Sequence, residues 1–117
     1  MDNNTITIMK DYEESISLSF QKIDKSLKEF TEADQAQQRN LEFEIKCETY
    51  KVKTFIGLMK VEWANLNETI YKDKWEKIIF KLNSKCDEYK KQFNQMINQD
   101  IHPMNEYMRQ NEKICWC

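Results

Sequence analysis

The spacing of apolar side chains predicts helices from one end of the chain to the other. The first series has steps of three, four and seven residues and comprises Met9, Ile16, Phe20, Ile23, Leu27 and Phe30. Steps of this kind place apolar side chains on one stripe of a helix, as in a coiled coil. We therefore predict an amphipathic helix over about residues 5–30, with Tyr12 beside the stripe and Glu13 interrupting it once.

Two further series predict two more helices. The second contains Leu41, Ile45, Val52, Phe55, Met59 and Trp63, and it lacks one position at Glu48. The third is uninterrupted and contains Trp75, Ile79, Leu82, Cys86, Tyr89, Phe93 and Met96. We place these helices at about 41–64 and 68–99. The turn between them is predicted at Asn65, as an N-cap, with Glu68 at the capping-box position.

An antiparallel hairpin is the fold that these two helices favour. If they fold back about the turn, residues whose numbers sum to about 134 face each other, and the pairs are apolar almost throughout. The contacts of this hairpin would come from a seam of Phe55, Met59, Trp75, Ile79, Leu82, Tyr89, Phe93 and Met96. The first helix, or a helix from outside, would cover its open side.

The predicted fold is therefore an elongated all-α protein. It comprises a long, coiled-coil-like αα-hairpin, an N-terminal amphipathic helix and a short C-terminal helix at about 103–113, which begins at Pro103. With 117 residues, one glycine and one proline, the chain fits a single domain over 1–117 and has too little turn chemistry for a sheet fold.

Charge and hydropathy narrow the classes of partner. The net charge of -2 argues against nucleic-acid binding. The first 50 residues are acidic and the rest basic, which suits either contact between the segments or two differently solvated faces. No stretch matches a membrane span or a cleavable targeting signal, so we expect an intracellular chain that contacts membranes only peripherally, if at all.

The residues that carry catalysis in other proteins are sparse. His102 is the sole histidine, Gly57 is the sole glycine, and no Cys-x-x-Cys pair occurs. These facts exclude a histidine dyad and a glycine-rich phosphate loop, and they give a zinc site little support. We therefore expect no enzyme activity, no cofactor and no metal.

The cysteines allow two modifications. Cys47 and Cys86 would lie nearly opposite each other in the hairpin, as a disulfide in an oxidising compartment or as buried free thiols. The stapled form loosely resembles the twin-cysteine helical hairpins of the mitochondrial intermembrane space, which use two cysteines per helix where this chain has one. The tail from Cys115 to Cys117 resembles the Cys-x-Cys tail of small vesicle-trafficking GTPases, which implies prenylation; palmitoylation and an unmodified, packed tail are the alternatives.

Surplus apolar positions suggest that the helices have partners outside the chain. They lie beside the main stripes, at Phe43, Leu58, Tyr71, Ile97 and Ile101. We expect a non-catalytic structural subunit that contacts other protein subunits of a large assembly, with a mitochondrial respiratory-type or a cytoskeletal complex favoured. The alternative is a lipid-anchored coiled-coil adaptor in vesicle traffic.

Overall fold

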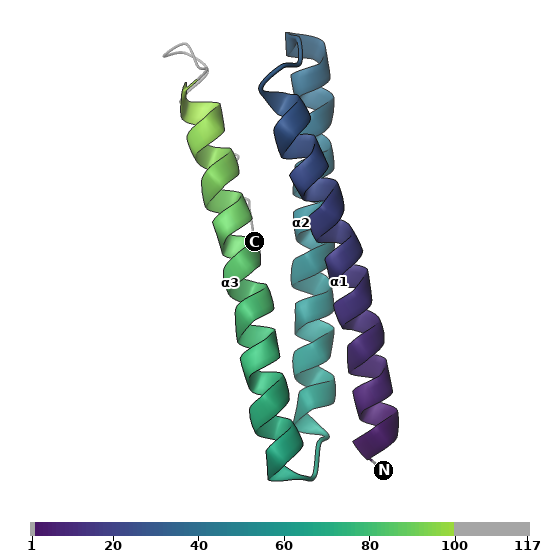
Figure 1. Ribbon diagram of the computed structural model, residues 1–117. Helices are drawn as coiled ribbons and strands as arrows, with labels where there is room; N and C mark the ends of the chain where they lie inside the picture. The colour runs from purple at the N-terminus through teal and green to yellow at the C-terminus, as the bar shows by residue number, and fades with distance from the viewer. Residues whose placement is uncertain (1, 100–117) are drawn as a thin grey trace.

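The computed structural model describes residues 2–99 as three antiparallel helices that run up, down and up (Figure 1). They are α1 (Asp2–Phe30), α2 (Gln35–Ala64) and α3 (Thr69–Gln99), and no strand occurs between residues 2 and 99. The molecule is elongated, with extents of 54 × 23 × 15 Å. This confirms the predicted all-α, elongated fold. The expected helix at 103–113 lies outside the described residues.

The predicted apolar stripes form one core. Its members from α1 are Met9, Ile16, Phe20, Ile23, Leu27 and Phe30. Those from α2 are Ile45, Val52, Ile56 and Met59, and those from α3 are Trp75, Ile79, Cys86, Tyr89, Phe93 and Ile97. Each helix is therefore held by burial of one apolar stripe, which is the main source of helix stability in folded proteins.

The most extensive helix contact joins α1 to α2. The sequence predicts α2 and α3 as the central hairpin and α1 as its cover. In the structure α1 and α2 form the larger helix–helix contact, and α3 packs on this pair. Ser19 and Ser26 on α1 are buried, and on α2 Thr49 is buried with its hydroxyl donating to the Ile45 carbonyl at 2.7 Å. Small side chains at an interface let two helices approach closely, and an analysis of apolar positions alone does not detect them.

Glu48 fills the missing position of the second series as a buried carboxylate. Its Oε1 accepts a hydrogen bond from Lys51 Nζ at 3.1 Å and lies 3.7 Å from Lys22 Nζ of α1. Burial acts to raise the pKa of Glu48. Hydrogen bonds from Ser19 and Lys51, together with the two lysine charges, outweigh burial and lower the pKa. The carboxylate is thus a polar link between α1 and α2.

Helix α3 is attached to α2 by polar contacts along one edge. Lys53 Nζ donates to Asn83 Oδ1 at 2.6 Å and to Asp87 Oδ1 at 2.8 Å. Near the turn, the indole Nε1 of Trp63 donates to the Lys72 carbonyl at 2.8 Å. The contacts of Lys53 with Asn83 and of Trp63 with Lys72 fall within two positions of the predicted antiparallel register.

Aromatic contacts join α3 to α1 across the third side of the bundle. The rings of Phe30 and Phe93 meet edge to face with centroids 5.3 Å apart, and those of Phe20 and Tyr89 are also 5.3 Å apart. Burial, with Asp24 as hydrogen-bond partner, raises the pKa of Tyr89. Tyr89 is therefore an uncharged part of this interface.

The first turn is shorter than the gap between the helices predicted at 5–30 and 41–64, because α1 ends at Phe30 and α2 begins at Gln35. Asp34 is the N-cap of α2, and its side chain accepts from the Gln37 N–H at 2.9 Å. Gln38 Nε2 donates to the Phe30 carbonyl at 3.0 Å, which satisfies an end group of α1. Because both helix ends are capped within the polar run at 31–40, α2 begins at Gln35 instead of about residue 41.

The second turn is closed by a residue from the far end of the chain. The prediction that Asn65 is an N-cap is wrong, since Asn65 is the C-cap of α2. Asp2 supplies the acceptors instead: Oδ1 accepts from the Asn67 N–H at 3.1 Å and Oδ2 from the Glu68 N–H at 3.0 Å. These contacts fix the start of α1 against the start of α3.

Asp2 makes the stability of the folded chain depend on pH in the acid range. Its hydrogen bonds with the Asn67 and Glu68 N–H groups lower the pKa of its carboxyl. A lowered pKa stabilises the folded chain above the ordinary carboxyl pKa of about 3.9, and the contribution is lost as the pH falls through the folded value. Thermal unfolding from pH 7 to pH 2 should therefore show a smaller acid-induced drop in Asp2→Asn than in the wild type. Superimposable pH profiles would contradict this role.

The two phenylalanines of α3 lie in different environments, one in the core and one on the surface. Phe93 is fully buried and Phe80 is 71% exposed. Phe93→Ala should lower the free energy of unfolding by about 3–5 kcal/mol. Phe80→Ala, its matched control, should change it by no more than about 0.5 kcal/mol. Urea denaturation measures both, and equal losses would show that the core is wrongly placed.

Candidate helix-docking surface

A second apolar stripe runs along the outside of α2. We call it the outer seam, and it consists of Phe43, Cys47, Tyr50, Thr54, Gly57, Leu58 and Val61. At 100° per residue, its members lie on the opposite side of α2 from the buried Ile45, Val52 and Met59. The seam has its own alternation of three and four residues and is about 27 Å long at 1.5 Å per residue. Helix α2 thus has one apolar face inside the bundle and another outside it.

The large side chains of the outer seam are exposed. Phe43 is 71% exposed, Tyr50 70% and Val61 61%, while Leu58 is at 40%. Single exposed apolar residues are ordinary on protein surfaces, and Leu18 on α1 is one of them. A row of exposed residues along one helix face instead marks an interaction surface.

The polar members of the seam do not interrupt it. Thr54 donates its hydroxyl to the Tyr50 carbonyl at 3.0 Å. The hydroxyl is thus satisfied within the helix turn, and the residue needs no water partner for it. Cys47 is half-buried and is a free thiol.

Gly57 lies in the middle of the outer seam, and the fold of the chain does not require a glycine at this position. A Cβ added there would meet nothing within 4 Å, and no residue among 2–99 has a positive φ. Glycine inside a helix costs about 1 kcal/mol relative to alanine. A position without a side chain on an exposed apolar face permits another backbone to approach closely.

The flanks of the seam carry charges of both signs. They include four lysines and three glutamates that border the stripe, Lys46, Lys51, Lys53, Lys60, Glu42, Glu44 and Glu62, while Glu48 is buried against α1. Lys53 forms its ion pair with Asp87 of α3, and Lys60 is exposed. The outer surface of this part of α2 therefore combines an apolar stripe with a border of mixed charge.

The residues predicted to form the seam of the hairpin pack inside the three-helix bundle. Its members Met59, Trp75, Ile79, Tyr89 and Phe93 are buried, and Phe55, Leu82 and Met96 are half-buried against the core. Among the surplus apolar positions, Phe43 and Leu58 are exposed as expected. Ile97 is buried and Tyr71 is half-buried, which corrects their assignment to outer faces; Ile101 lies outside the described residues.

The cysteines of the hairpin are free thiols in the structure. Burial raises the pKa of Cys86, which packs in the core as a small apolar side chain. Cys47 lies on the outer seam. The predicted lipidation sites Cys115 and Cys117 lie outside the described residues.

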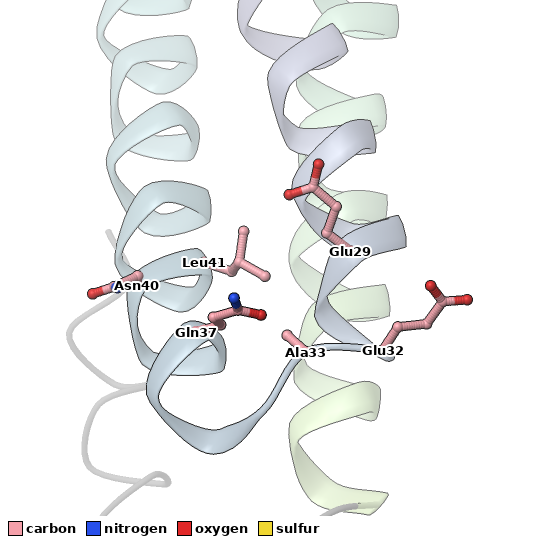
Figure 2. A pocket seen from close by; sticks show the side chains of 6 residues that line it. All are labelled: Glu29, Glu32, Ala33, Gln37, Asn40 and Leu41. Atoms are coloured by element: carbon pink, nitrogen blue, oxygen red, sulfur yellow. The ribbon is translucent and has the colours of Figure 1, made fainter.

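A hollow lies at the turn between α1 and α2 (Figure 2). Its lining comprises Glu29, Glu32, Ala33, Gln37, Asn40 and Leu41. Figure 2 shows the side chains of Glu32 and Asn40 pointing away from each other, so they do not converge on a common ligand. Residues 2–99 also contain no group of three or more His, Cys, Asp or Glu side chains placed to hold a metal ion.

Comparisons with known proteins give no indication of what the outer seam binds. Neither protein-family models, nor curated proteins, nor solved structures give a match to this chain. Within residues 2–99, none of the helices has an apolar run that could cross a bilayer.

Gly57→Ala tests whether the fold itself needs the glycine. Because the site is exposed, helical and unobstructed, alanine should raise the free energy of unfolding of the isolated chain by about 0.5–1 kcal/mol. Denaturant unfolding of wild type and variant at one protein concentration measures the change. A destabilised variant would mean that the glycine serves the packing of the chain itself.

Proposed function

We propose that this chain is a non-catalytic structural subunit of a multiprotein assembly, which it joins through helix–helix contacts made by the outer seam of α2. The observation that carries the proposal is the second apolar face of α2, directly opposite the face that builds the core. Its heptad spacing supports a coiled-coil-like contact, in which alternating side chains insert between those of a partner helix.

The buried polar groups support a structural role. Asp2 closes the turn between α2 and α3, and Glu48 joins α2 to α1. Each of these carboxylates therefore has a task in holding helices together. The exposed aromatic side chains of Phe43 and Tyr50 are of the kind that contributes most to protein interfaces.

The setting of this assembly stays a prediction. The sequence favours two kinds of assembly, a mitochondrial respiratory-type complex or a cytoskeletal complex. The alternative function, a lipid-anchored adaptor in vesicle traffic, depends on Cys115 and Cys117. It predicts extra mass on the last peptide of the chain, which the structural-subunit proposal does not need.

Native size fractionation from the chain's own cells tests the proposed function. The wild-type chain should elute in a complex of fixed stoichiometry, and the double variant Phe43→Asp with Val61→Asp should elute at the mass of the lone chain. Charges on an apolar interface are desolvated without a partner, so most of the complex should be lost.

The matched control is Leu18→Asp, which adds the same charge at an exposed leucine on α1. It should leave the complex intact. Circular dichroism should show that the double variant and the control are as helical as the wild type. A double variant that stays in the complex would overturn the assignment of the outer seam.

A further inference from the structure

We draw no further inference here: the strongest candidate, the outer seam of α2, is bordered by lysines and glutamates alike, and nothing in the structure shows what covers it.

Discussion

The close contact between α1 and α2 is the constraint on which the rest of the bundle depends. Small side chains at Ser19 and Ser26 let the two helices approach, and the buried carboxylate of Glu48 links them through Ser19 and two lysines. Removing one partner of a buried ion pair leaves an uncompensated buried charge, which costs more free energy than the pair itself contributes. A helix pairing that separates Glu48 from its partners is therefore disfavoured. Helix α3 then packs on the pair through Phe30, Phe20 and the Lys53 contacts.

This arrangement leaves α2 with one face inside and one outside. The inner face meets α1 on one side and α3 on the other, so α2 contacts both neighbours, yet Phe43, Tyr50 and Val61 remain in water. Such exposure lowers solubility and contributes nothing to the isolated fold. The amphipathic partner that we propose would account both for the spacing of the outer seam and for the glycine within it.

The helices and most of the core were predictable because apolar periodicity is a local property of the sequence. It located the stripe from Met9 to Phe30 and the register of α2 against α3. The cap of α3 by Asp2 was not predictable, because Asp2 and Glu68 are 66 positions apart in the sequence and form no local motif. The outer seam was indicated in part by Phe43 and Leu58, but the sequence alone did not distinguish it from the buried face. Ile97, expected outside, is buried because the core stripe of α3 continues to the end of the helix.

Radical footprinting of Phe43 and Tyr50 tests most directly whether α2 uses both of its faces. Oxidation of the two rings would be compared between the isolated chain and the native assembly, with exposed Phe80 as internal reference. We expect strong oxidation of both rings in the isolated chain and marked protection in the assembly, while Phe80 is oxidised equally in both. Equal oxidation of Phe43 and Tyr50 in the two states would contradict the claim that the outer seam is a binding surface.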